Sequence, residues 1–161
     1  MDLYPWIVYV HVAGVLVFVL GHGASVAVAF KVRSEREPQR IQALLQLSTW
    51  ALGIFYVGVL LLLGAGIWAG FTPGIDGSWW SDRWIWVALG TFVLTMFAMY
   101  GIASNYYRRV RTVVDAMVDG SQAVSVERLV EVLSGPRPWL LAVIGFGSLF
   151  FILYLMLFKP F

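Results

Sequence analysis

The strongest constraint on this chain is a set of four apolar stretches that contain no Asp, Glu, Lys or Arg. They cover residues 4–30, 47–71, 84–106 and 139–158. Each reaches the ~20 residues that a helix needs to cross the hydrocarbon core of a bilayer. The composition agrees, because 60% of the residues are hydrophobic and 12% are charged, about half the charge of a soluble domain. We predict an all-α, polytopic membrane protein with one domain over residues 1–161, a tight four-transmembrane-helix bundle.

The positions of the positive charges predict the orientation of this bundle. The first and third connections hold most of the Lys and Arg residues: Lys31, Arg33, Arg36 and Arg40 in one, and Arg108, Arg109, Arg111, Arg128 and Arg137 in the other. Short connections that are rich in Lys and Arg stay on the cytoplasmic side of a membrane. We therefore expect both basic connections in the cytoplasm and both termini outside.

The two basic connections also contain helical patterns. Pro38 suits the first turn of a helix, where a missing N–H has no cost, so the second helix is expected to begin before it enters the bilayer. In the other connection, apolar residues recur at helical spacing over residues 110–117 and 126–133. Asp119-Gly120 separates these segments and Gly135-Pro136 ends the second. We expect two short amphipathic cytoplasmic helices that lie against the membrane surface or the bundle ends; docking of a partner is the alternative.

The outer connection, "FTPGIDGSWWSDRWIW", is rich in tryptophan: Trp79, Trp80, Trp84 and Trp86. Indole rings favour the headgroup layer of a bilayer, because the ring is apolar and its N–H needs a partner. The simpler interpretation is therefore an interfacial belt, together with Trp6 and Trp68. The alternative is an aromatic lid over an outward-facing pocket, since so many tryptophans exceed what a belt needs.

Glycines are frequent in the spans, and in a bilayer they let helix backbones approach closely. The second span contains Gly53, Gly58, Gly64, Gly66 and Gly70, and the first contains Gly14, Gly21 and Gly23. Gly90, Gly101, Gly145 and Gly147 occur in the third and fourth spans. We expect these positions to form the seams between helices, and a leftover glycine face is compatible with a homo-oligomer.

Both histidines of the chain, His11 and His22, lie in the first span. At ~100° per residue their spacing is about three turns, so they project from one face with ~16 Å between them along the axis. Polar side chains at this depth normally face the bundle interior. Three roles remain open: structural hydrogen bonds, which we favour; ligation of haem or a metal, with Met96, Met99 or Met156 as second ligands; and a proton pathway. A bis-histidine haem would need a second histidine from another helix, and none is present.

Other chemistry is poorly supported by the residues. The chain has no cysteine, which excludes disulfides, thiolate metal sites and thiol nucleophiles. No carboxylate lies inside a span, and Ser25, Ser48 and Thr49 have no evident base, so we assign no catalytic residue and expect no enzyme. Copper bound by His and Met would find too few ligands to specify a site. The partner implied by composition is the lipid bilayer, not nucleic acid.

A resemblance to a known family rests on several segments together. These are the "HVAG" and "GHG" motifs of the first span, the Gly-rich second span, the Trp-rich turn, "YYRRVR" after the third span and the closing "LFKPF". The chain resembles bacterial four-helix membrane proteins catalogued as domain of unknown function 2269. That family is similar in layout to copper-resistance D-type proteins and to HemJ-type membrane protoporphyrinogen oxidases. The resemblance implies a four-helix fold in the bacterial cytoplasmic membrane and implies no reaction.

Similarity to the HemJ type implies one site residue. A histidine of the first helix is associated with haem there, and His11 matches its position, which makes haem b the cofactor implied for His11 and, more remotely, His22. The HemJ type also uses a third-helix lysine, whereas this chain has Trp84, Ile85 and Trp86 there. We therefore expect a non-enzymatic integral membrane protein or an accessory subunit of a membrane assembly. The alternatives are a haem- or copper-binding redox protein and a small-molecule carrier that works as an oligomer.

Overall fold

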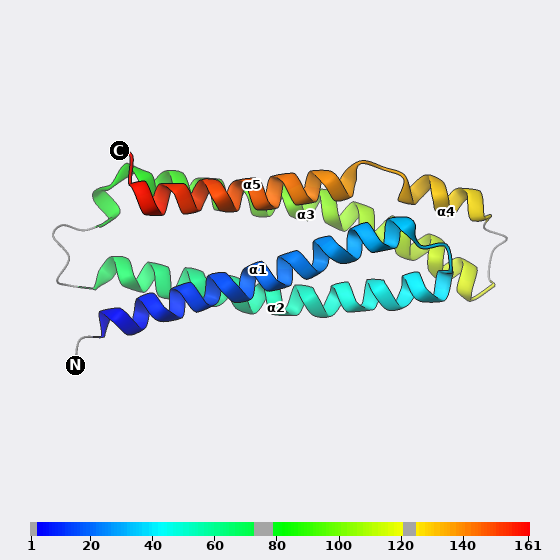
Figure 1. Cartoon of the computed structure of the whole chain (residues 1–161), viewed down its shortest axis with the longest axis horizontal. Helices are drawn as coiled ribbons and strands as arrows, with labels where there is room; N and C mark the ends of the chain where they lie inside the picture. The colour runs from blue at the N-terminus through cyan, green and yellow to red at the C-terminus, as the bar shows by residue number, and fades with distance from the viewer. Residues whose placement is uncertain (1–2, 73–78, 121–124) are drawn as a thin grey trace.

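The computed structural model describes residues 3–72, 79–120 and 125–161, and the regular elements of this part are all helical. Figure 1 shows the long helices side by side, with the short helix α4 (Val126–Leu133) at one end. The elements are α1 (Tyr4–Ser34), α2 (Pro38–Phe71), the 3₁₀ turn η1 (Trp79–Ser81), α3 (Arg83–Val118), α4 (Val126–Leu133) and α5 (Arg137–Phe158). Four helical segments are long and apolar enough to cross a membrane, which confirms the predicted class.

Local chemistry explains where the helices begin and end. Pro38 occupies the first turn of α2, as predicted, and α4 begins after Ser125, whose side chain accepts a hydrogen bond from the Arg128 N–H. α3 ends just before Gly120, which has a φ of 62°, a left-handed conformation that glycine adopts without strain. Gly135 and Pro136 separate α4 from α5. The boundary signals in the sequence were therefore correct.

The long helices extend beyond the predicted spans, and one prediction about the connections was wrong. Residues 110–117 do not form a separate amphipathic helix, because α3 continues without a break from Arg83 to Val118. No turn-forming residue lies between the apolar span and this segment, so the helix simply leaves the membrane and goes on. The second predicted helix, residues 126–133, is present as α4.

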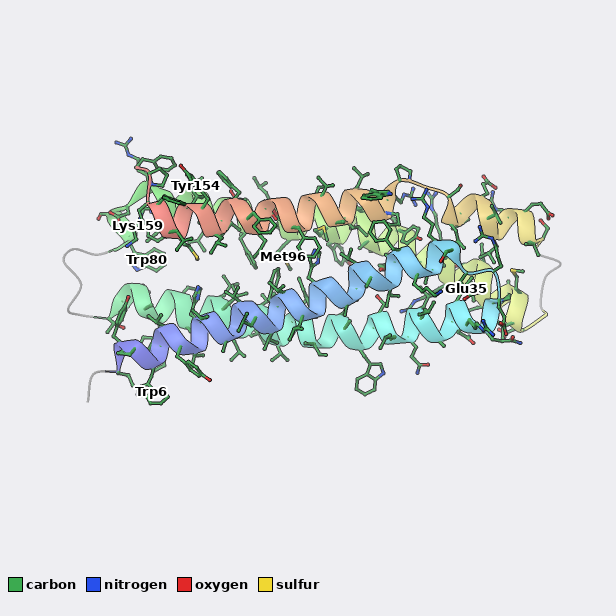
Figure 2. The ribbon with its side chains drawn as sticks, viewed as in Figure 1. Trp6, Glu35, Trp80, Met96, Tyr154 and Lys159 are labelled. Carbon is green, nitrogen blue, oxygen red and sulfur yellow. The ribbon has the colours of Figure 1, made fainter. Side chains whose placement is uncertain are left out.

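The connection between α1 and α2 is short and is held by one carboxylate. Glu35 accepts hydrogen bonds from the backbone N–H groups of Arg36 at 2.9 Å and Glu37 at 3.3 Å. These bonds to the charged form lower the pKa of Glu35 below its ordinary value. Figure 2 shows Glu35 at the end of the molecule opposite Trp6 and Lys159. We call this the basic end, defined by the α1–α2 connection and α4, and the opposite one the terminal end, where α1 begins and α5 finishes.

The helices associate as two pairs, and glycines allow the closest contact, between α1 and α2. A Cβ added at Gly14 would overlap the backbone of Leu61 and Leu62, and one at Gly21 would overlap the backbone of Phe55. Gly58 lies in the same way against the Phe18 backbone. The second pair is α3 and α5, which run side by side in Figure 1.

Not every glycine lies in a seam. Gly23, Gly53, Gly64, Gly90, Gly101 and Gly147 have open space where a Cβ would be. The expectation that the span glycines mark contacts between elements is thus right for Gly14, Gly21, Gly58, Gly66, Gly70 and Gly145 and wrong for these six.

An apolar cluster at the basic end joins the two pairs. It is formed by Val28 and Val32 of α1, Ile41 and Leu45 of α2, Tyr106, Val110 and Val114 of α3, and Leu129 and Leu133 of α4. All of these side chains are buried, most of them completely. We call this group the basic-end cluster. α1 approaches α5 toward the same end, as Figure 1 shows, and the rings of Phe30 and Trp139 meet there with centroids 4.9 Å apart.

The terminal end is built differently. Ile7, Ala65 and Ala69 form a small buried cluster between α1 and α2, and Trp84, Ala88 and Leu155 form another between α3 and α5. Each cluster belongs to one pair, and neither bridges the two. The prediction of a tight bundle is therefore wrong for this half of the molecule, where packing within each pair leaves a cavity between the pairs.

The outward faces of the long helices are apolar. Leu60 and Phe97 are each 74% exposed, and Leu94 is 72% exposed. Water would not tolerate so much exposed apolar surface on a monomer, whereas lipid chains solvate it without cost. The surface thus supports the membrane setting independently of helix length.

The close α1–α2 seam generates a stability prediction. We expect Gly58→Ala to destabilise the protein by about 1–3 kcal/mol, because the added methyl group overlaps the backbone around Phe18, which cannot rotate away. The measurement is SDS-induced unfolding of the purified protein in mixed micelles, followed by circular dichroism. Gly64→Ala is the matched control, since its methyl group enters open space and alanine favours helix. Equal stability of the two variants would contradict the described seam.

Candidate binding site

A cavity of about 310 Å³ lies between the two helix pairs at the terminal end. All four long helices and η1 contribute to its wall, which is mainly aliphatic and aromatic. The polar groups in the wall are few: the imidazole of His11, the indoles of Trp80 and Trp84, the Tyr4 hydroxyl and the Lys159 amine. The cavity exists because the pairs each complete their own small cluster and do not fill the space between them.

His11 is one of the polar residues in the cavity wall. Its Nδ1 lies 2.7 Å from the carbonyl oxygen of Leu62 on α2. A carbonyl can only accept, so Nδ1 carries the hydrogen and Nε2 carries the lone pair in the neutral ring. Gly66 allows this position, since a Cβ there would lie 2.9 Å from Nδ1. The hydrogen bond expected for a histidine at this depth is therefore present for His11.

The Trp-rich turn contributes to both a belt and a lid. Trp86 is exposed, like Trp6 and Trp68, which suits an interfacial belt. Trp84 is 6% exposed, and Trp80 is half-buried against Phe71 at a centroid distance of 5.3 Å; both line the cavity. Figure 2 shows Trp80 between the two pairs. The Trp79 side chain and residues 73–78 lie outside the described residues, so the structure places only Trp80 and Trp84 at the cavity, and we call these two the lid.

Specific contacts hold the lid in place. Trp86 donates from Nε1 to the Trp80 carbonyl oxygen at 2.9 Å, and Trp84 donates from Nε1 to Asp82 at 3.2 Å. On the α2 side, Trp80 packs on Gly70, where a Cβ would lie 3.1 Å from the indole nitrogen. Lys159, just after α5, places its amine 5.6 Å from the Trp84 ring centroid, within range of a cation–π contact.

His22 lies elsewhere and has a different environment. It is 6% exposed and is enclosed by Phe18, Phe55 and Phe146. Its Nε2 has no hydrogen-bond partner among the described residues and faces Gly145 of α5, where a Cβ would overlap the ring. The hydrogen bond expected for a deep histidine is thus absent at this nitrogen. The His22 ring packs between α1 and α5.

Comparison with known proteins identifies the family. A family model described as "Predicted integral membrane protein (DUF2269)" matches residues 5–160. The chain belongs to the DUF2269 family. Neither the curated proteins nor the solved structures contained a match.

The residues of this DUF2269 protein fit a small ligand better than haem b. At His22, Nε2 lies so close to Gly145 of α5 that even a Cβ there would overlap the ring, which leaves little space for an iron atom on this nitrogen. At His11, the cavity of about 310 Å³ is roughly twice one of ~150 Å³ that holds a single benzene, whereas a porphyrin is several times larger than benzene. Met156 shares the His11 cavity, but Met96 and Met99 do not line it. Within the described residues, no group of three or more His, Cys, Asp or Glu could hold a metal ion.

Part of this site was predictable from the sequence of the DUF2269 chain. His11 and the lid alternative for the tryptophans were named, whereas the roles of Gly66, Gly70 and Lys159 in the cavity were missed. The high frequency of glycine in the second span indicated close contacts. It could not show which residues Gly66 and Gly70 would contact, because those residues belong to other segments. Lys159 was noted only as part of the tail, because its proximity to Trp84 depends on how α3 and α5 pair.

The two histidines should respond differently to the same substitution. We expect His11→Leu to lower stability, because it removes the bond to the Leu62 carbonyl, an interhelical contact that contributes about 0.6–2 kcal/mol in membranes. His22→Leu should be neutral or stabilising, because it removes a buried nitrogen without a partner from an apolar shell. Both are measured by unfolding in mixed micelles.

The same two variants test the haem and metal alternatives. Absorption spectra and metal analysis of the purified protein should show no chromophore or metal that depends on His22. Colour or metal lost in His22→Leu would contradict the packing role and restore a ligand role for this histidine.

Proposed function

We propose that this chain is a non-enzymatic binding protein of the membrane, which holds a small, mainly apolar molecule with one hydroxyl group between its two helix pairs. The observation that carries the proposal is the apolar cavity with His11 fixed in its wall. A wall that is mostly hydrophobic, with one or two fixed polar groups, is typical of small-molecule sites. As an accessory subunit, such a protein would present its ligand to a larger assembly.

The size of the cavity limits the ligand. About 310 Å³ lies at the lower end of the roughly 300–1,000 Å³ that is usual for ligand sites. By comparison with the ~150 Å³ that accommodates benzene, two fused or linked rings are the expected dimension. The aromatic side chains of Trp80, Trp84 and Phe92 in the wall favour a flat, ring-containing molecule.

The tautomer of His11 determines which polar group the ligand is expected to carry. Because Nδ1 donates to Leu62, the ring offers Nε2 as a hydrogen-bond acceptor. A hydrogen-bond acceptor in the wall favours a ligand with a hydrogen-bond donor, such as a phenol or an alcohol, over a ligand that can only accept hydrogen bonds. The backbone partner also holds the ring in one orientation, which lowers the entropic cost of binding.

The membrane and orientation are proposed on the distribution of charge. The basic end carries the arginines of both connections, and such charge is typical of the cytoplasmic side of the bacterial cytoplasmic membrane. Both termini would then lie outside, and the cavity would lie in the outer half of the bilayer. A ligand would enter from the outer leaflet or from beyond it.

A matched pair of probes tests the binding function. We expect 1-naphthol to bind the purified protein more tightly than naphthalene does, by roughly two- to tenfold, because its hydroxyl donates to His11 while its rings fill the same space. In His11→Leu this preference should disappear, with naphthalene still bound. The measurement is titration calorimetry at one fixed detergent concentration, so that partition into micelles is the same for each variant.

His22→Leu is the matched control, since His22 does not line the cavity, and it should keep the preference. Failure of both probes to bind the unmodified protein would overturn the proposal. A preference that persists in His11→Leu would show that the hydroxyl is recognised elsewhere, and loss of naphthalene binding there would show that the cavity needs His11 for its shape.

Orientation can be tested with single cysteines, because the chain has none. We expect Phe161→Cys in intact cells to react with a maleimide that cannot cross membranes, and Gln39→Cys to react only after lysis. Both positions are exposed, so access depends on the side of the membrane. The reverse pattern would contradict the proposed orientation.

A further inference from the structure

A second cavity, of about 710 Å³, lies at the basic end between α3, α4 and the start of α5. Four arginines line it, two from α3, one from α4 and one from α5: Arg108, Arg109, Arg128 and Arg137. Glu131 is the acidic residue of the lining, and the Thr112 hydroxyl is also present. The cavity therefore has a strong positive charge, and nothing in the binding function proposed above uses it.

Two of these arginines have no protein acceptor within the described residues. Arg128 pairs with Glu131 at 2.6 Å, and Arg108 donates to the Asn105 amide oxygen at 2.7 Å. For Arg109 and Arg137, no carboxylate or carbonyl in the described ranges accepts a hydrogen bond. Guanidinium groups that converge on one cavity repel one another, so an anion bound between them would stabilise the arrangement.

The cavity lies at the level where the helices leave the hydrocarbon. On α3, residues 84–107 contain no charged side chain, and Arg108 and Arg109 follow at once. On α5, Arg137 precedes an uncharged stretch over residues 138–158. The exposed Trp139 marks the same level as a membrane interface. An anion at this depth is expected to be attached to a lipid.

The fold holds the cavity open at this level. Arg33 of α1 donates to the Ser134 carbonyl oxygen at 3.2 Å, which ties the turn before α5 to α1. Leu129 and Leu133 of α4 are buried in the basic-end cluster, so α4 cannot move over the arginines without exposing them. These contacts hold the helix segments that carry the arginines in place around the cavity.

From these observations we propose that the basic-end cavity binds the phosphate group of an anionic phospholipid, with Arg109 and Arg137 as its principal ligands. Planar guanidinium groups match phosphate oxygens in pairs of hydrogen bonds, which makes arginine suited to this role. Basic pockets between transmembrane helices at the cytoplasmic surface bind such headgroups. The acyl chains would lie along the exposed apolar faces of α3 and α5.

The experiment is native mass spectrometry of the full chain in mixed micelles that contain phosphatidylglycerol and phosphatidylcholine in equal amounts. We expect the unmodified protein to retain phosphatidylglycerol preferentially. Arg109→Gln and Arg137→Gln should each weaken that retention roughly fivefold, and the double variant more. Arg36→Gln is the matched control, because it removes the same charge from the same end outside the cavity.

Each other outcome overturns the proposal. An equal loss in Arg36→Gln and in the cavity variants would show attraction to net charge without a site. No preference for phosphatidylglycerol in the unmodified protein would show that the arginines do not bind this headgroup. Release of the lipid by millimolar inorganic phosphate, which carries the same chemistry without acyl chains, would assign the cavity to a soluble phosphate. Circular dichroism of each variant confirms that the fold is retained.

Discussion

The basic-end cluster is the contact on which the arrangement of the helices depends. Most of its side chains, such as Val32, Ile41, Val114 and Leu133, lie beyond the four uncharged stretches and therefore beyond the hydrocarbon. Apolar burial has a driving force there, since the alternative is contact with water and headgroups. Inside the bilayer that force is absent, because lipid chains are as apolar as the side chains. The two helix pairs are thus joined most extensively where water is present, whereas inside the bilayer they meet in local contacts such as His22 against Gly145.

This division explains why a cavity forms at the terminal end. Within each pair, close approach of backbones or a few buried side chains provide the contact, as at Gly58 against Phe18 and at Ala88 beside Leu155. Between the pairs, the rings of Phe18 and Phe92 meet in the middle with centroids 6.2 Å apart, and the cavity opens beyond them. The apolar side chains that line this space lose little free energy when they contact a bound molecule or lipid chains in place of one another. A bundle in water would have collapsed on the same space.

The fold class was predictable because it follows from chain-local properties. Each signal affects only the segment that contains it: the uncharged stretches, the proline at the start of α2 and the glycine after α3. The predictions based on these signals were correct. The failure at residues 110–117 has the same origin: periodicity showed an amphipathic helix, but nothing local distinguishes a separate helix from the extension of one. The pairing of helices depends on registers between distant segments, so the looseness of the terminal end had no signal in any one span.

For the histidines, the sequence predicted the face of α1 on which they lie but not the residues that they contact. Their spacing correctly placed both on the inward side of α1, but it could not tell which helix each would meet. α1 crosses from α2 toward α5, so His11 meets the Leu62 carbonyl of α2 whereas His22 meets Gly145 of α5.

The environments of the tryptophans also depend on which neighbour each one meets. Trp84 and Trp86 are two positions apart and so lie on nearly opposite faces of α3. The belt and lid interpretations are therefore compatible, because Trp86 is on the exposed face and Trp84 lines the cavity. Trp80 contacts Gly70 and Phe71 of one pair and Trp86 of the other. Because Trp80 contacts both pairs at the terminal end, a widening of the cavity there would disturb the contacts of this indole.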